Sequence, residues 1–227
     1  NARWDSLVMN GPARHDRFPP LRFNSDPNGF PSKDEVTRYF EDFAKQIQAP
    51  IHCGIEVTST TARPDGGYQV ETSKGNFHSD HVIAATGPFQ IPVIPAIVPE
   101  GAVSQMHSFD YQNPQQLQDG AVLVVGAGSS GAQIATELLG SGRKVYLSIG
   151  PHDRPPRSYR GKDFVWWLGA LGKWQMQTPP FGKKHVTIAV SGVNGGETVD
   201  FRKLADRGMI LLGMAEAYES GVISIAD

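Results

Sequence analysis

The stretch that most constrains the fold is VLVVGAGSSGAQIATELLGSGRKVYL, which runs from Val122 to Leu147. A strand-type apolar run is followed by a glycine-rich turn, by apolar residues at helical spacing and by a second strand-type run. A strand, a turn, a helix and a parallel strand in this order open a dinucleotide-binding domain. We therefore predict α/β structure with a parallel sheet at this point of the chain.

The turn GAGSSG has the glycine spacing of a nucleotide-binding loop. Gly126 permits the tight turn, Gly128 lets the backbone approach a pyrophosphate, and Gly131 lets the helix pack closely on the strand. Ser129 and Ser130 open the helix, whose free N–H groups and positive dipole end attract phosphate. These five residues form the predicted nucleotide-binding loop; a glycine-rich turn without a ligand is the alternative.

The sequence after the second strand favours NADPH. An acidic residue about 20 positions after the turn would bind the ribose 2′-hydroxyl of NAD or FAD, but no carboxylate occurs from Ser148 to Gly150. Arg154 and Arg160 in the following basic loop are the predicted ligands of the NADPH 2′-phosphate, because guanidinium groups bind phosphate through charge-assisted hydrogen bonds. A solvated basic loop is the alternative, and use of NADH is left open.

Composition excludes several other classes. Of 227 residues, 21 are Lys or Arg and 23 are Asp or Glu, so the net charge of −2 offers no general attraction for nucleic acid. No apolar run approaches the roughly 20 residues of a membrane span, and with no secretory signal in the sequence a cytoplasmic location is expected. Cys53 is the only cysteine, which excludes a CxxC redox pair within this sequence, and the histidine spacing suggests no metal site.

The residues before the glycine-rich turn read as mixed α and β material. We expect a short strand at Arg3–Met9 and, after a loop, a helix that begins with the capping box of Ser32 and Glu35. Three strand-type runs should follow as a meander, over 51–60, 68–72 and 76–86, the last including Val82 to Thr86. After the basic loop we expect a helix at FVWWLGAL, strands at HVTIAV, MILL and VISIA, and a helix around Val199 to Arg207.

The proline-rich stretch QIPVIPAIVPEG separates the meander from the glycine-rich unit. Four prolines make it extended and incompatible with a helix. We therefore predict two domains, one at residues 1–117 with a linker at about 88–117, and one at residues 118–227.

A nucleotide-binding turn that follows a meander ending in ATG is the layout of two-dinucleotide flavoproteins. The chain resembles the flavin-containing monooxygenase family, including its bacterial members described in terms of cation transport. The motifs that carry the resemblance are RWDSLVMNGP, FPSKDEVTRYFEDFA, VIAATGPFQIPVIP, MHSFDY, GAGSSGAQIATELL and RPPRSYRGKDFVWWL. The resemblance implies a partial FAD-binding domain with a β-meander, followed by an inserted NADPH-binding Rossmann domain.

The family's first glycine-rich motif, which binds the FAD pyrophosphate, does not occur in this sequence. A βαβ unit of about 30 residues is expected before Asn1, and the ending VISIAD precedes the strands that would close both domains. We therefore expect an internal fragment of a longer enzyme that is inactive by itself.

The resemblance also implies roles for single residues. Asn10 corresponds to the catalytic asparagine near the flavin and its oxygen adduct; a turn-forming asparagine before Gly11 is the alternative. Trp4 falls where the same loop passes the flavin. Val57, otherwise an ordinary strand valine, corresponds to a residue whose backbone meets the FAD adenine. Thr86 and Gly87 match the ATG turn beside the flavin or its pyrophosphate.

One family motif is retained only in part. His107 and Tyr111 match its second half, but Val103 stands where the family has glycine four residues before the histidine. A structural histidine is therefore as good an interpretation as a functional one. Trp166 and Trp167 are better explained as helix core than as a substrate cage.

The implied activity is that of an FAD-dependent NADPH monooxygenase. NADPH would reduce FAD, and a C4a-(hydro)peroxyflavin would transfer one oxygen atom to a small organic substrate. The expected partners are this substrate and molecular oxygen; a homodimer is left open. The alternatives are a flavin-dependent NAD(P)H reductase without oxygen transfer, and a non-catalytic nucleotide-sensing flavoprotein associated with transport.

Overall fold

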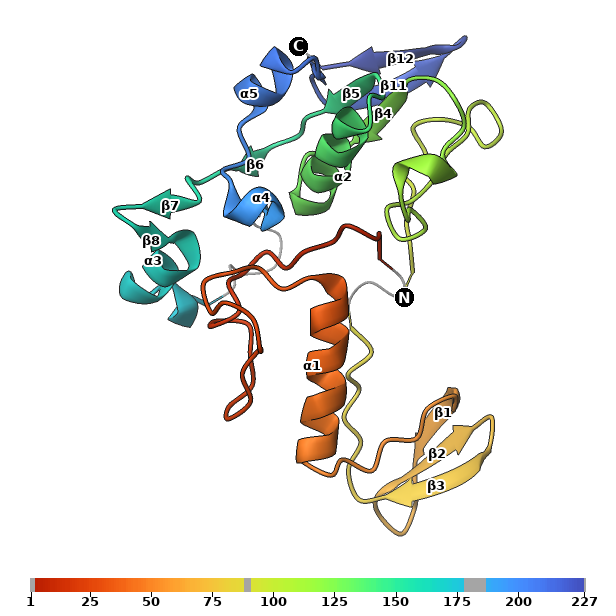
Figure 1. The fold of residues 1–227 in the computed structure, drawn as a ribbon. Coiled ribbons are helices and arrows are strands. Elements are labelled where there is room, and N and C mark those ends of the chain that lie inside the picture. The colour runs from red at the N-terminus through yellow and green to blue at the C-terminus, as the bar shows by residue number, and fades with distance from the viewer. Residues whose placement is uncertain (1–2, 88–90, 178–186, 227) are drawn as a thin grey trace. The chain divides into compact units, whose positions relative to one another are not determined.

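A computed structural model describes residues 3–87, 91–177 and 187–226 (Figure 1). The chain divides into two compact units, one of Asn1–Phe40 with Val93–Asp227 and one of Glu41–Pro92. These units do not follow the predicted boundary near residue 117, because the first forty residues pack with the glycine-rich part of the chain. The assignment of residues 1–117 and 118–227 to two cofactor domains stays a prediction.

The centre of the first unit is a three-stranded parallel sheet. Its order is β10 (Ile210–Leu212), β5 (Val145–Ser148), β4 (Val122–Val125), and α2 (Ser129–Gly140) connects β4 to β5. The register pairs Val124 of β4 with Leu147 of β5. The predicted strand–turn–helix–strand unit and the strand at MILL are therefore confirmed.

A hydrophobic core forms between this sheet and its helices. Leu138 of α2 and both Val145 and Leu147 of β5 are fully buried. Phe201 and Leu204 of α5 (Phe201–Asp206), a helix expected from the sequence, join the same cluster. The alternating small and large residues of α2, Ala135 beside Leu138, let the helix lie close to the sheet.

The N-terminal segment packs on this core without forming the expected strand. Residues Arg3–Met9 make one isolated bridge, between Val8 and Ser32, because no second strand lies beside them in the described chain. Backbone hydrogen bonds hold the segment instead: the N–H of Asp5 donates to the carbonyl of Gln112 at 2.8 Å. The strand prediction for this segment is wrong.

Helix α1 (Lys33–Gln46) begins at the predicted capping box. The backbone N–H of Ser32 donates to Glu35 Oε2 at 2.8 Å, and the N–H of Glu35 donates to Ser32 Oγ at 3.3 Å. The first of these bonds lowers the pKa of Glu35. Among the apolar side chains of this helix and its end, Tyr39 is buried, while Phe40 and Ile47 are more than half exposed.

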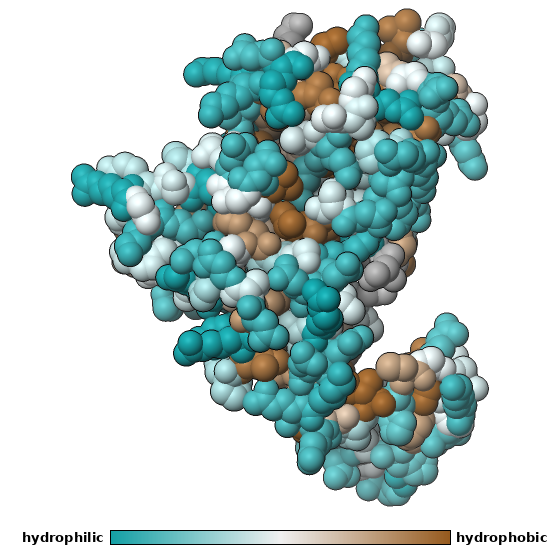
Figure 2. Space-filling model, in the orientation of Figure 1, coloured by the Kyte–Doolittle hydropathy of each residue, from teal (hydrophilic) through white to brown (hydrophobic). Residues whose placement is uncertain are grey.

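The second unit contains the meander. Strands β1 (Val57–Ala62), β2 (Tyr68–Thr72) and β3 (Gly75–Ser79) form an antiparallel sheet in the order β1-β2-β3, and none of them pairs with β4. The strand predicted at Val82–Thr86 is not formed, and the backbone of these residues is irregular. Figure 2 shows hydrophobic side chains on the surface of this small unit. Val57 at the start of β1 is 58% exposed.

Short elements complete the first unit. They are η1 (Pro114–Gln116), β6 (His152–Asp153), β7 (Ser158–Tyr159), β8 (Lys162–Asp163), α3 (Phe164–Ala170), η2 (Lys173–Gln175), β9 (Thr187–Ile188), α4 (Val193–Gly196), β11 (Ala215–Glu219) and β12 (Val222–Ile225). Helix α3 and strand β12 confirm the elements expected at FVWWLGAL and VISIA. Part of the expected strand HVTIAV lies outside the described residues; its described part contributes β9, which pairs with β6.

Within the described ranges, no helix combines the length and apolar character that crossing a bilayer requires. The same residues contain no group of three or more His, Cys, Asp or Glu side chains arranged to hold a metal ion.

Candidate nucleotide-binding site

The predicted nucleotide-binding loop joins β4 to α2. Gly126 has a φ of +100°, a left-handed conformation that glycine adopts without strain. Its N–H donates to the carbonyl of Ser148 at 3.0 Å, which fixes the turn to the end of β5. Gly128 is the N-cap residue of α2, with extended backbone and no side chain over the helix end. The first N–H groups of a twelve-residue helix are thus presented at this turn.

Gly131 is the glycine that the packing requires most strictly. A Cβ atom at this position would lie 1.9 Å from the carbonyl oxygen of Gly126 and 3.6 Å from Val124 Cγ1. Both the turn and strand β4 therefore touch the helix backbone here. Gly128 has a different neighbour, since its Cβ would lie 3.5 Å from His152 Cε1. The tight turn predicted at Gly126 and the close packing predicted at Gly131 match this geometry, and the approach of a pyrophosphate to Gly128 stays a prediction.

The hydroxyl of Ser129 is engaged by the chain around β9. Ser129 Oγ donates to the carbonyl of Ile188 at 3.5 Å and accepts from the N–H of Val190 at 3.2 Å. Ser129 therefore fixes a neighbouring segment with its side chain and can offer a ligand its backbone N–H. Ser130 is half-buried in the first turn of α2.

The end of β5, where many dinucleotide sites have a carboxylate, holds a buried serine. Ser148 Oγ donates to the carbonyl of Gly213 and accepts from the N–H of Ala215, both at 3.0 Å. This side chain ties β5 to the β10–β11 connection. Two residues on, a Cβ at Gly150 would meet nothing within 4 Å, so this position is open to a larger side chain.

The two predicted phosphate ligands are exposed and lie in different parts of the basic loop. Arg154 follows β6, and its guanidinium lies over the Phe201 ring at 4.4 Å from the ring centroid. His152 lies beside Gly128, and Arg154, two positions after His152 in sequence, donates from Nη1 to the His152 carbonyl at 3.3 Å. Arg160 lies in the β7–β8 hairpin, over the ring of Tyr159. Figure 1 shows this hairpin on the far side of β6 from β5.

Arg157, which belongs to the same basic loop, is a buried structural residue. It is 3% exposed, its Nε donates to Asp163 Oδ2 at 2.9 Å, and its guanidinium stacks on Phe30. Neither terminal nitrogen has a hydrogen-bond partner among the described residues. The sequence offered only a weak signal for this role, namely an acidic residue six positions after the arginine.

Asn10 is connected directly to α2. Gln133 Nε2 donates to Asn10 Oδ1 at 2.9 Å, although 123 positions separate the two residues. Gln133 is 4% exposed, and sequence reasoning missed it because it stands on an apolar helix face where no motif marks it. The hydrogen bond orients the Asn10 amide so that its NH₂ group remains a donor.

Trp4, a predicted cofactor contact, and Tyr111, from the partly retained family motif, are both part of the hydrophobic core. Trp4 is 2% exposed and packs in the cluster that contains Tyr111 and Leu138. The Tyr111 hydroxyl donates to Glu137 Oε2 at 2.7 Å, and burial together with this carboxylate raises the pKa of Tyr111. Tyr111 therefore anchors the connector to α2. A contact of Trp4 with a cofactor stays a prediction.

Three predicted cofactor residues belong to the second compact unit. Val57 begins β1, next to a register shift, and is largely exposed. Thr86 is exposed as well, and Gly87 has a φ of +77°, consistent with the predicted turn after the ATG sequence. Their roles toward FAD stay predictions.

Asp16 forms a second electrostatic feature near Asn10. A Cβ at Gly11 would lie 2.2 Å from Asp16 Oδ2, so the carboxylate lies directly against the Gly11 backbone. Burial raises the pKa of Asp16; the charges of His15 and Arg157 and a hydrogen bond from Gly11 act in the opposite direction. The carboxylate is therefore held where its ionised form is disfavoured.

Solved structures share this architecture. A double-mutant flavin monooxygenase from Stenotrophomonas maltophilia superimposes with a TM-score of 0.73 over 99% of this chain and 61% of that chain, at 18% identity. The fold is thus that of two-dinucleotide-binding flavoproteins, of which this chain holds a part, and the predicted fold class is confirmed.

Sequence comparison gives the family. Residues 12–170 match the pyridine nucleotide-disulphide oxidoreductase family, and the chain belongs to it. An uncharacterized oxidoreductase CzcO-like from Geobacillus kaustophilus is 45% identical over 173 residues, 75% of this chain and 49% of that protein. Flavin-containing monooxygenase 1 of Mus musculus is 31% identical over 159 residues, 64% of this chain and 30% of that protein. The predicted kinship with flavin-containing monooxygenases is confirmed; the chain spans about half the length of its CzcO-type relatives.

Replacing Gly131 with alanine should destabilise the fold. The new methyl group would meet a backbone carbonyl, so α2 must move, at a cost of about 1–3 kcal/mol. Gly140→Ala is the matched control in the same helix, because a Cβ there meets nothing within 4 Å. This control should be neutral or stabilise by about 0.5–1 kcal/mol, through better helix propensity. Denaturant unfolding of both variants gives the comparison; equal free energies of unfolding would contradict the proposed close packing.

Replacing Asp16 with asparagine should increase stability at neutral pH. A carboxyl group with a raised pKa binds its proton more tightly in the folded state, so stability falls as pH rises from 3.8 through the folded-state pKa. At pH values above this interval, the free energy of unfolding of the variant should therefore exceed that of the wild type. This difference should disappear below pH 3.8. Unfolding curves recorded across pH test this, with exposed Asp206→Asn as the control. A variant less stable than the wild type at pH 7 would show that the charge itself is stabilising.

Proposed function

We propose that this chain is part of an FAD- and NADPH-dependent monooxygenase. The observation that carries the proposal is the glycine-rich loop: backbone packs so closely at Gly131 that no side chain fits, and a helix N-terminus opens beside it. Such a loop suits the pyrophosphate of a dinucleotide. The relationship to flavin-containing monooxygenase 1 of Mus musculus supports the choice of reaction.

The residues present fit NADPH. The backbone from Gly126 to Gly131 would hold the pyrophosphate. The buried Ser148 leaves no carboxylate at the ribose 2′-position, where it would repel a phosphate. Arg154, exposed and close to His152, would bind the 2′-phosphate, with Arg160 as the second proposed ligand.

The residues proposed to contact FAD are Asn10, Trp4, Val57, Thr86 and Gly87. When bound, the flavin passes electrons from NADPH to molecular oxygen, and one oxygen atom goes to the substrate. The chain's own part is positional. Gln133 holds the Asn10 carbonyl oxygen, which leaves the amide NH₂ group to donate a hydrogen bond toward the reacting oxygen.

The activity can be tested on the full-length protein that contains this chain. We expect bound FAD and NADPH oxidation coupled to oxygenation of a soft nucleophile such as an aryl methyl sulfide. In the Asn10→Ala variant, hydrogen peroxide should rise several-fold at the expense of sulfoxide, because the positioned donor is lost. Asn76→Ala, at an exposed site on β3, is the control. NADPH oxidation without any oxygenated product from a panel of sulfides, amines and ketones would instead favour a reductase.

The choice of nucleotide is a separate prediction. Arg154→Ala should weaken NADPH binding by tenfold or more and leave NADH binding nearly unchanged, since a charge-assisted hydrogen bond is worth roughly 1.5–3 kcal/mol. Arg160→Ala tests the second proposed ligand in the same way. Gly150→Arg should instead strengthen NADPH binding, because the position is open and lies near the end of β5. Nucleotide titrations monitored by fluorescence measure all three; equal losses for both nucleotides would refute the 2′-phosphate assignment.

A further inference from the structure

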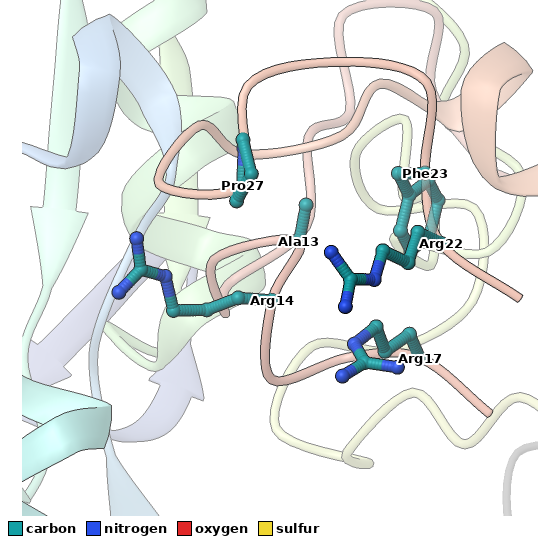
Figure 3. A pocket seen from close by; sticks show the side chains of 6 residues that line it. All are labelled: Ala13, Arg14, Arg17, Arg22, Phe23 and Pro27. Atoms are coloured by element: carbon teal, nitrogen blue, oxygen red, sulfur yellow. The ribbon is translucent and has the colours of Figure 1, made fainter. Parts of the chain in front are cut away.

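The loop between Gly11 and Pro31 borders an open surface pocket of about 280 Å³ that the proposed function does not use. The pocket is lined by Ala13, Arg14, Arg17, Arg22, Phe23 and Pro27 (Figure 3). None of these residues belongs to the predicted nucleotide-binding loop or to the residues proposed to contact FAD. Its volume is close to the lower end of the range of small-molecule sites, about 300–1,000 Å³.

The lining of this pocket is strongly basic. Figure 3 shows the guanidinium groups of Arg17 and Arg22 close together, whereas the Arg14 side chain points away from both of them. Among the ion pairs of the described residues, none involves any of these three arginines. Two neighbouring cations without a counter-charge repel each other, and an anion between them removes this cost.

The pocket is held in shape by contacts below the arginines. The Tyr39 hydroxyl accepts from the N–H of Phe18 at 2.6 Å, and the Tyr39 ring stacks on Phe23 with centroids 4.2 Å apart. Across the loop, the N–H groups of Ala13 and Arg14 donate to backbone carbonyls of Gly29 and Pro27. An anion would therefore meet a preformed frame and order little new chain.

We propose that this pocket binds a small dianion, a phosphate group or a dicarboxylate, between Arg17 and Arg22. Planar guanidinium groups offer paired N–H donors that match the oxygens of both anions. The face of Phe23 supplies the apolar contact for the remainder of the molecule. Arg14 also lines the pocket, but its guanidinium points away from Arg17 and Arg22, so the proposed site rests on the latter two arginines.

Inorganic phosphate and malonate are the probes for this site. Each is titrated at constant ionic strength into the full-length protein, with saturating NADP⁺ present so that the glycine-rich loop is occupied, and heat and melting temperature are measured. We expect saturable binding and a rise in melting temperature. Arg17→Gln and Arg22→Gln should each weaken binding at least tenfold, while Arg202→Gln, exposed on α5, should not. The stronger of the two probes identifies the anion class.

The same variants separate binding from a structural role. Because two like charges repel in the empty pocket, Arg22→Gln should leave the melting temperature without anion unchanged or raise it. A lowered melting temperature without anion would mean that the arginine is structural and would overturn the proposal. It would also be overturned by unaltered phosphate and malonate affinity in both variants, or by no saturable binding of either probe to the wild type.

Discussion

The contact between the Gly131 backbone and the Gly126 carbonyl is the constraint on which the remaining structure depends. It sets the distance between α2 and β4, and with it the side chains that fit into the core, such as Ala135 and Leu138. A single methyl group at this contact would push the helix away from the strand. The requirement for glycine at this position is therefore one of packing.

Helix α2 also organises chain segments far from it in sequence. Its inner face receives Trp4 and Tyr111, and its polar residues Gln133 and Glu137 bind Asn10 and Tyr111. The loop that bears Asn10 is thus attached to the helix that carries the nucleotide-binding turn. A displacement of this helix would therefore shift both the loop that bears Asn10 and the glycine-rich turn, because rigid, well-packed contacts transmit small shifts.

Local patterns predicted local structure well. The capping box of Ser32 and the glycine spacing of the turn each depend on residues a few positions apart, and both have the expected geometry. Two predictions that depended on distant pairing failed: Arg3–Met9 and Val82–Thr86 have strand composition but form no strand in the described chain. The Asn10–Gln133 bond and the burial of Arg157 could not be read from sequence for the same reason, since neither residue has a local motif.

The burial of Arg157 limits how the nucleotide preference of such a protein can be re-engineered. Its guanidinium lies between Phe30 and Asp163, so exchanging the whole basic loop for that of another enzyme would remove a packing element together with the surface charges. Arg154, Arg160 and Gly150 are exposed or open, and can vary one at a time. With the proposed 2′-phosphate ligands, changes of nucleotide specificity would be made at these separate surface positions, with Arg157 in the middle of the loop left in place.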